Sequence, residues 1–122
     1  MSALKNTWYF PDMFYPASTE LNGYVSHEAI CVLNPSNQDA SLKLTLFYEN
    51  SEPIEDLCFV CKARTTNHIR LDQVKDRNGD PIQKEVGYAG MLESDVPVVA
   101  QYTRVDTSQG NLALMTTLGV GE

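Results

Sequence analysis

Short runs of alternating apolar and polar residues are the feature of this sequence that most constrains its fold. In the clearest run, residues 42–48, leucines and a tyrosine at the even positions alternate with Lys43, Thr45 and Phe47, the pattern of a strand with one buried face. No window long enough for a helix keeps an apolar period of about 3.6 residues. The runs are Lys5–Phe10, Glu28–Asn34, Leu42–Tyr48, Leu57–Ala63, Asn67–Leu71, Val86–Leu92, Val96–Asp106 and Leu112–Leu118.

The spacing of these runs, roughly 8–14 residues, is typical of an all-β sandwich or barrel. We therefore predict an all-β fold, a single-domain antiparallel β-sandwich of about eight strands. The chain has 122 residues, enough for one hydrophobic core and too few for a second. We expect one domain over residues 1–122, with an aromatic N-terminal strand and loop at 1–24 and the core of the sandwich at 25–118.

Charge and composition exclude several classes of function. Nine lysines and arginines against 16 aspartates and glutamates give a net charge of −7, and so acidic a chain repels phosphate backbones, which argues against nucleic acid as a partner. We find neither the basic start and apolar run of a signal peptide nor the ~18–20 apolar residues of a membrane span. A cytoplasmic location is therefore expected, and three cysteines, an odd number, fit a reducing compartment.

The cysteines and histidines do not predict a metal or redox centre. Cys58 and Cys61 form a CxxC motif, but residues i and i+3 of a strand point to opposite faces, so we expect inert thiols. Zinc would need a second pair of ligands, and Cys31 is the one cysteine left. His27 and His68 also match no zinc spacing. No metal or other cofactor is expected.

Five aromatic side chains crowd the N-terminal segment, which should turn irregular where it contains Pro11, Pro16 and Gly23. So many aromatics are unusual for a solvent-exposed loop. Either they close one end of the core or a contact between subunits, or they form a stacking wall for the ring of a ligand. The residues are Trp8, Tyr9, Phe10, Phe14 and Tyr15.

Residues 96–106 form an apolar run that turns polar along its length. Its β-branched and aromatic residues predict a strand, with Pro97 tolerated near the start because proline cannot donate to a ladder. An unpaired buried polar group costs about 1–3 kcal/mol. Gln101, Arg104 and Asp106 therefore need partners, in a polar pocket or at a sheet edge.

Polar side chains at strand positions and strand ends are the candidate ligand-binding residues. They combine donors and acceptors of both charges, suited to hydrogen-bonding a hydroxyl-rich or carboxylate-bearing ligand. The alternative is that Arg104 with Asp106, or Arg70 with Glu28, form intersubunit or surface ion pairs worth under about 1 kcal/mol each. The candidates are Glu28, Asn34, Arg64, His68, Arg70, Gln101, Arg104 and Asp106.

The consecutive Ser26, His27 and Glu28 contain the residue types of a catalytic triad. Adjacent strand residues project to alternate faces and cannot relay a proton among themselves. We therefore expect these three side chains to serve separate sites or to cap the entrance to the strand.

Three motifs in one order resemble the sensory rhodopsin transducer family, a group of small soluble proteins. They are Ser26–Asn34, then Ala63–Arg64 with His68–Arg70, and Ser94–Val99 leading into Gln101–Asp106. The resemblance runs from roughly residue 25 to 118 and is loose around Trp8. It implies a β-sandwich subunit assembled into a ring-like homotetramer, with no enzymatic activity. The ligand-binding residues it implies are Ser26, His27, Glu28, Asn34, Arg64, His68, Arg70, Gln101, Arg104 and Asp106.

We therefore expect a non-catalytic module that binds a small polar molecule, carbohydrate-like in character, or relays a signal. One alternative is a soluble transducer that docks to the cytoplasmic face of a sensory rhodopsin, because an acidic protein suits the basic cytoplasmic loops of membrane proteins. Another is an isomerase or cyclase that uses His27 or His68 as its base.

Overall fold

The computed structural model describes residues 2–18, 25–109 and 111–122. Within them the regular elements are β-strands, all paired antiparallel, and one short 3₁₀ turn, η1 (Leu71–Gln73), so the predicted all-β fold is confirmed. No helix in these ranges is long and apolar enough to cross a membrane. The strands are β1 (Lys5–Phe14), β2 (His27–Asn34), β3 (Ala40–Tyr48), β4 (Ile54–Cys61), β5 (Thr65–Arg70), β6 (Gly87–Asp106), β7 (Ala113–Leu118) and β8 (Val120–Gly121).

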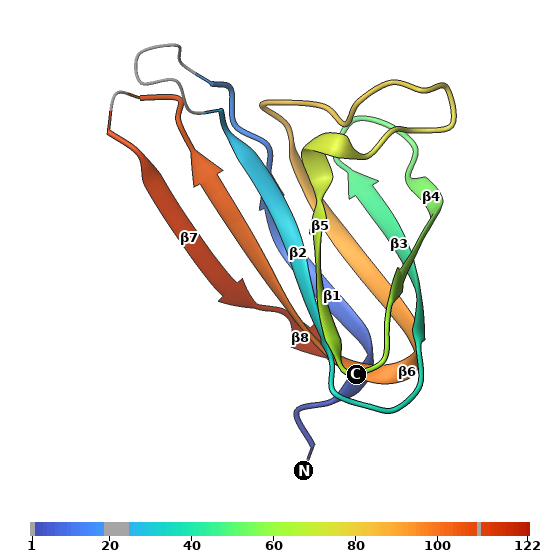
Figure 1. The fold of residues 1–122 in the computed structure, drawn as a ribbon. Coiled ribbons are helices and arrows are strands. Elements are labelled where there is room, and N and C mark those ends of the chain that lie inside the picture. Colours follow the sequence, from blue (N-terminus) through green and yellow to red (C-terminus); the bar gives the residue numbers. More distant parts are fainter. Residues whose placement is uncertain (1, 19–24, 110) are drawn as a thin grey trace.

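The strands form two sheets that share β6. Sheet A has the order β4–β3–β6–β1–β8, and sheet B has the order β5–β2–β6–β7. The first arm of β6, residues 87–94, pairs with β1 and β3, whereas its second arm, residues 99–106, pairs with β2 and β7. Figure 1 shows β6 descending in one layer and returning in the other, so the two sheets face each other.

A bulge carries β6 from sheet A to sheet B. The register with β1 jumps there from Thr7 opposite Glu93 to Lys5 opposite Val98. The Ser94 hydroxyl donates to the Val96 carbonyl oxygen at 2.6 Å and accepts a hydrogen bond from the Val96 N–H at 3.3 Å. The bulge therefore satisfies its own backbone groups at the point where pairing is interrupted.

The sequence predicted two strands, Val86–Leu92 and Val96–Asp106, where the structure has one. The polar residues 93–95 suggested a break between them. The backbone stays extended because side chains replace the backbone hydrogen bonds that are lost at the bulge. Asp95 Oδ1 accepts from the Ser41 N–H at 2.7 Å, in addition to the two Ser94 hydrogen bonds with Val96. Pro97 is exposed at the bulge, a position where no ladder donor is required.

The core between the sheets follows the predicted alternation. Leu42, Leu44 and Leu46 of β3 are at most 2% exposed and share one cluster with Ile30 and Val32 of β2. Full burial of such a side chain contributes about 1.5–3 kcal/mol. The neighbours of these residues on each strand therefore face outward, away from the core.

β1 continues beyond its predicted end at Phe10. Pro11 and Asp12 lie in a bulge, where the register with β6 shifts between Phe10 and Met13. Trp8, Phe10 and Tyr15 are buried in the core, which agrees with the interpretation that these aromatics close it. The end of the predicted irregular loop, residues 19–24, lies outside the described residues.

The C-terminal strands lie at the margins of the sandwich. All six residues of β7 are exposed, Leu114 to 77%, although the alternation of residues 112–118 is typical of a strand with one buried face. β8, which is too short for a sequence pattern, pairs with Trp8 and Tyr9 of β1. Gly121 allows this close approach because a Cβ there would lie 2.5 Å from Cγ of Lys5.

Candidate functional site

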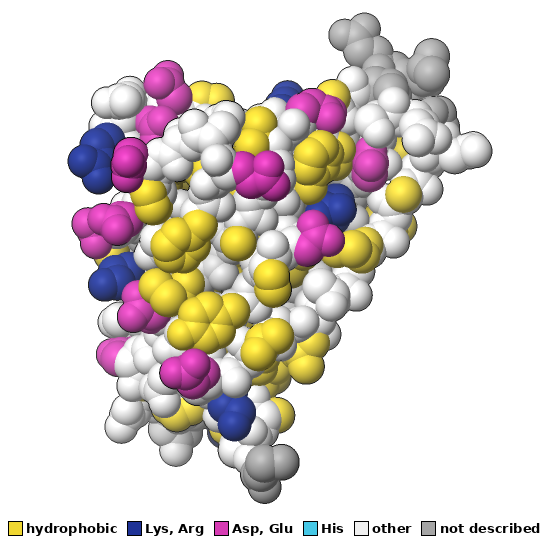
Figure 2. Space-filling model, turned by 180° about the vertical axis from the view of Figure 1, so that it is seen from behind, with side chains coloured by type: hydrophobic (Ala, Val, Ile, Leu, Met, Phe, Trp, Pro, Cys, Tyr) yellow, Lys and Arg dark blue, Asp and Glu magenta, His cyan; other side chains and the backbone are white. Residues whose placement is uncertain are grey.

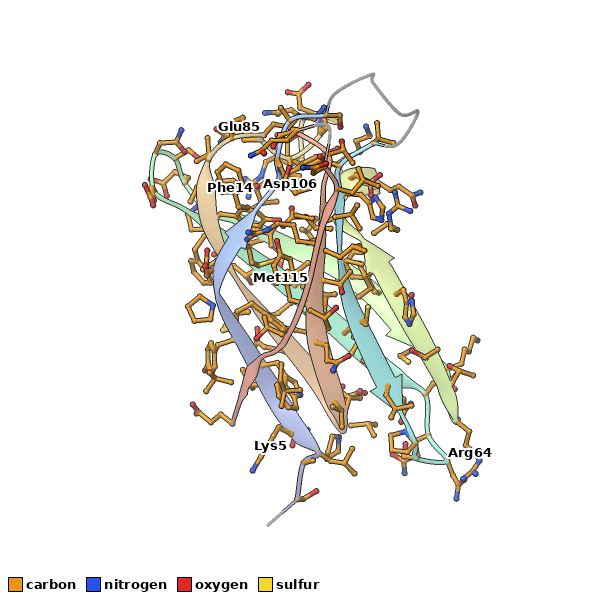
Figure 3. The ribbon with its side chains drawn as sticks, turned by 90° about the vertical axis from the view of Figure 1, so that its left-hand side faces the viewer. Lys5, Phe14, Arg64, Glu85, Asp106 and Met115 are labelled. Carbon is orange, nitrogen blue, oxygen red and sulfur yellow. The ribbon has the colours of Figure 1, made fainter. Side chains whose placement is uncertain are left out.

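The ten candidate residues lie in four separate places. Figure 3 shows Arg64 at one end of the sandwich and Asp106 at the other, so a single pocket cannot include both. The four places are the outer face of sheet B (His27, His68, Arg70 and Gln101), its inner face (Glu28 and Arg104), the turns at one end (Asn34 and Arg64) and the opposite end (Ser26 and Asp106).

The outer face of sheet B collects four candidates because of strand pairing. Ile30 and Val32 point into the core, so His27 and Cys31 of β2 point outward. Cys31 is directly opposite His68 of β5 on one side and Gln101 of β6 on the other. One row of side chains therefore runs His68–Cys31–Gln101 across three strands, and Arg70 lies two residues further along β5.

A shallow hollow of about 260 Å³ lies on this row. His68 and Gln101 supply its polar edges, and Leu33 and Val99 supply apolar walls. The Thr66 hydroxyl also lines it but is engaged, because it donates to the Val32 carbonyl oxygen at 3.0 Å. Polar groups at the rim of an apolar hollow are typical of sites for small ligands.

A larger groove of about 480 Å³ separates β4 from β5, where the edge of sheet A meets the edge of sheet B. The Asn67 side chain spans the gap, donating from Nδ2 to the Val60 carbonyl oxygen at 2.9 Å. His68, Arg70 and Lys75 line the groove together with Asp56. His68 therefore borders both the groove and the hollow.

Arg70 is held in place by a carboxylate that the sequence analysis did not single out. Its Nε and Nη2 donate to the two oxygens of Asp72, each at 2.8 Å. This bidentate pair raises the pKa of the Arg70 guanidinium. The alternative of a surface ion pair between Arg70 and Glu28 is not realised within the described chain, because the two residues lie on opposite faces of sheet B.

Glu28 is fully buried and forms the centre of a polar network. Tyr88 donates its hydroxyl to Oε1 at 2.5 Å, and Tyr102 donates to Oε2. Arg104 Nε in turn donates to the Tyr102 oxygen at 3.2 Å. Two donated hydrogen bonds and a nearby guanidinium are what a buried carboxylate requires.

The environment of Glu28 shifts its protonation equilibrium. Burial raises the pKa of the Glu28 carboxyl above its ordinary value, and the hydrogen bonds from Tyr102 and Tyr88 and the charge of Arg104 offset part of that rise. Burial and the Glu28 carboxylate likewise raise the pKa values of both tyrosines. Neither tyrosine was among the candidates predicted from the sequence, although a glutamate within the apolar strand Glu28–Asn34 signals a need for buried donors.

Arg104 belongs to this network rather than to an open pocket. Its guanidinium lies 5.8 Å from the centre of the Phe14 ring and 5.5 Å from that of Tyr102. Its nearest carboxylate is Asp12, with 3.9 Å between Arg104 Nη2 and Oδ1. The alternative of a surface ion pair with Asp106 is not realised within the described chain, because that carboxylate accepts instead from the N–H and hydroxyl of Ser108.

The remaining candidates hold turns. Asn34 is fully buried, donates to the carbonyl oxygens of Gln38 and Cys61 at 2.7 and 3.0 Å, and accepts from the Ser36 N–H. Arg64 occupies a left-handed turn with φ of 59° and an exposed side chain. Ser26 is buried, and its hydroxyl accepts from the Thr107 N–H at 2.8 Å.

The cysteines are free thiols in three different environments. Cys58 is exposed and Cys61 buried, so the CxxC motif spans both faces of β4 as predicted. Burial raises the pKa of the half-buried Cys31 thiol, which makes it a poor nucleophile. Among the residues with described positions, no group of His, Cys, Asp and Glu side chains could hold a metal ion.

Fold and site together define a small β-sandwich module with one long strand common to both sheets and an open polar sheet face. A family model described as Anabaena sensory rhodopsin transducer matches residues 4–120. The chain belongs to this family, and the resemblance inferred from its three motifs is confirmed. Membership supports a transducer-type module.

Two solved structures are similar over nearly the whole chain. The crystal structure of Thermotoga maritima 1070 is 33% identical, with a TM-score of 0.85 over 97% of this chain and 95% of that chain. The Anabaena sensory rhodopsin transducer is 30% identical, with a TM-score of 0.72 over 90% of this chain and 96% of that chain. A comparison with curated proteins finds no match.

The buried carboxylate predicts a pH-dependent stability. Because the pKa of Glu28 is higher in the native protein than in the unfolded chain, the native state binds the proton more tightly, and the free energy of unfolding falls as pH rises between the two pKa values. Glu28→Gln should remove this pH dependence. In the wild type the total decrease in the free energy of unfolding is about 1.4 kcal/mol for each unit by which the two pKa values differ. Urea unfolding at a series of pH values measures it.

Glu55→Gln, at an exposed position of β4, is the matched control for that experiment. Parallel pH profiles for the wild type and Glu28→Gln would show that Glu28 does not titrate differently in the folded protein.

Proposed function

We propose that this chain is a non-catalytic cytoplasmic module that binds a polar small molecule, such as a carbohydrate, on the outer face of sheet B. The observation that carries the proposal is the position of His68, which borders both the hollow of sheet B and the β4–β5 groove. A ligand centred on His68 reaches Gln101 on one side and Arg70 on the other. Each of these three residues is one of the original candidates.

The chemistry of this face suits a ligand with hydroxyl or carboxylate groups. The Arg70 guanidinium is already oriented by Asp72, so less side-chain entropy is lost when it binds. A hydrogen bond between a charged side chain and a ligand contributes about 1.5–3 kcal/mol. Leu33 and Val99 provide apolar contact for the less polar side of the same ligand.

The alternative of a histidine-dependent isomerase or cyclase has less support. His27 Nδ1 lies 3.0 Å from the Val25 carbonyl oxygen, and within the described ranges neither imidazole has a carboxylate partner to orient it as a base. Family membership also points to a non-enzymatic module.

A second function, docking to the cytoplasmic face of a sensory rhodopsin, is favoured by the family. A similar solved structure, 30% identical to this chain, is named as a sensory rhodopsin transducer. The net charge of −7 suits the basic loops that membrane proteins present to the cytoplasm. Ligand binding and docking are compatible functions, because the bound ligand and the rhodopsin would be two separate binding partners of the same transducer.

We also propose that the chain assembles as a homotetramer through β7. This strand exposes both faces, including Leu114 and Leu118, and its outer edge is unpaired within the described chain. A free strand edge with exposed leucines is a template for pairing with another chain. A second subunit would cover it.

Ligand binding predicts a specific thermal shift. In a screen of sugars, sugar acids and other polar metabolites, one chemical class at a hundred times its Kd should add about 2.7 kcal/mol to the stability of the wild type. His68→Ala should lose this shift because the residue borders both parts of the site. Arg64→Ala is the matched control, since Arg64 is exposed at the far end of the sandwich. A shift that survives in His68→Ala, or is absent for every class, contradicts this site.

Docking predicts salt-sensitive binding to a membrane partner. The wild type should sediment with vesicles that contain a microbial sensory rhodopsin and not with empty vesicles of the same lipid. Binding should weaken as ionic strength rises, because opposite surface charges are screened. Equal sedimentation with both kinds of vesicle would contradict the docking role.

Assembly through β7 predicts that Leu114→Glu dissociates the oligomer, because it places a charged side chain in an apolar contact at each interface that β7 forms. Size-exclusion chromatography with light scattering should give a tetramer for the wild type and a monomer for the variant. Val60→Glu, at an exposed apolar position of β4, is the control and should remain tetrameric. A monomeric wild type, or a tetrameric Leu114→Glu, would disprove this arrangement.

A further inference from the structure

Sheet A presents an apolar outer face. The alternation that buries Trp8, Leu44 and Leu92 turns their neighbours outward, and strand pairing aligns these neighbours: Tyr9 is opposite both Met91 and Val120, and Phe47 is opposite Ala89. We call these residues and Pro11 the apolar band. Figure 2 shows hydrophobic side chains gathered across the middle of this side of the molecule. Val120 is 63% exposed and Phe47 is 42% exposed.

The surface is hollowed at one margin of the apolar band, beside the bulge in β1. This hollow of about 240 Å³ has Pro11, Phe47 and Ala89 among its walls. Two carboxylates, Asp12 and Glu49, also line it. The Asp12 side chain is 96% exposed, and the Glu49 carboxylate lies over Gly87, where a Cβ would be 3.0 Å from its Oε1.

The opposite margin of the apolar band carries Glu93 and Lys43, whose charged atoms are 3.9 Å apart. Arg104, 3.9 Å from Asp12, is largely buried and directed toward the Glu28 network. Glu122 pairs with Thr7 beside Glu93, and Lys5 lies against Gly121 at the same end. The margins therefore present four exposed or half-exposed carboxylates and two ammonium groups. An acidic rim around an apolar surface restricts which partner can cover it.

We propose that the apolar band is a docking surface for a segment of a partner protein that presents lysine or arginine side chains beside apolar ones. A cation entering the hollow meets Asp12 and Glu49 next to the Phe47 ring, so ion pairing and a cation–π contact act together. Apolar side chains of the same segment cover Tyr9 and Met91. A second copy of this chain is the poorer occupant, since the acidic margins of two apolar bands would meet with the same sign.

This inference deepens the docking role proposed above and rests on it for the identity of the partner. It is separate from the ligand site, because the apolar band and the His68 row lie on the outer faces of different sheets. One molecule can therefore hold a ligand and a partner at the same time.

Fluorescence anisotropy with a labelled synthetic peptide of lysine, leucine and phenylalanine tests the surface. The wild type should bind this peptide and not the same sequence with glutamate in place of lysine. Asp12→Lys combined with Glu49→Lys should weaken binding of the basic peptide by about tenfold or more and create affinity for the acidic one. Phe47→Ser should weaken binding without any change in charge, whereas Leu33→Ser, exposed on sheet B, should not.

A matched pair of substitutions separates this site from the general negative charge. Glu52→Lys combined with Asp80→Lys changes the net charge equally at exposed positions that do not line the hollow of the apolar band, and it should leave most of the affinity intact. Equal losses in the two double variants, or no saturable binding of the basic peptide, would overturn the proposal.

Rhodopsin-containing vesicles distinguish a failure of this surface from a failure of the docking role. If the wild type and the variant with Asp12→Lys and Glu49→Lys sediment equally well with these vesicles, docking stands and the apolar band is not its surface. If the wild type binds the basic peptide as expected but not the vesicles, the surface stands and its partner is another protein.

Discussion

The fold depends on one strand that belongs to two sheets. β1, β2, β3 and β7 all hydrogen-bond to β6, and β4, β5 and β8 are attached through those neighbours. The sandwich can close because the Ser94 and Asp95 side chains satisfy the backbone where β6 changes sheets. Both outer faces, and therefore both proposed binding surfaces, take their register from this strand.

The buried carboxylate ties the two arms of β6 together from inside. Tyr88 belongs to the first arm and Tyr102 to the second, and both donate to Glu28 of β2. The same network anchors Arg104, which reaches toward Asp12 at the bulge of β1. A polar cluster that resembled a ligand site in the sequence is thus the internal connection between the sheets. The side chains left for binding are those whose alternation points them away from it.

The features that the sequence predicted correctly, strands and their buried faces, depend on residues that are neighbours in the chain. Alternation in residues 42–48 predicted a strand and its buried face, because a strand turns every second side chain inward, and the apolar run 28–34 predicted a central strand. Contacts between distant residues were not predictable, since alternation does not contain strand order. Arg70, for example, forms its ion pair with Asp72 and not with Glu28. β7 has a regular alternation but stays exposed, because no element of the described chain covers it.

The long shared strand also dictates when the chain can fold during synthesis. Lys5 is paired with Val98, so β1 cannot complete its pairing until β6 has been synthesised. Before β6 emerges, the hairpin of β3 and β4 is the one pairing between consecutive strands that can form, and β2 with β5 can add to it. Pairing between residues so far apart slows folding. The strands that pair with β6 therefore remain unpaired until it has been synthesised. A chaperone that binds unpaired strands would act in this interval.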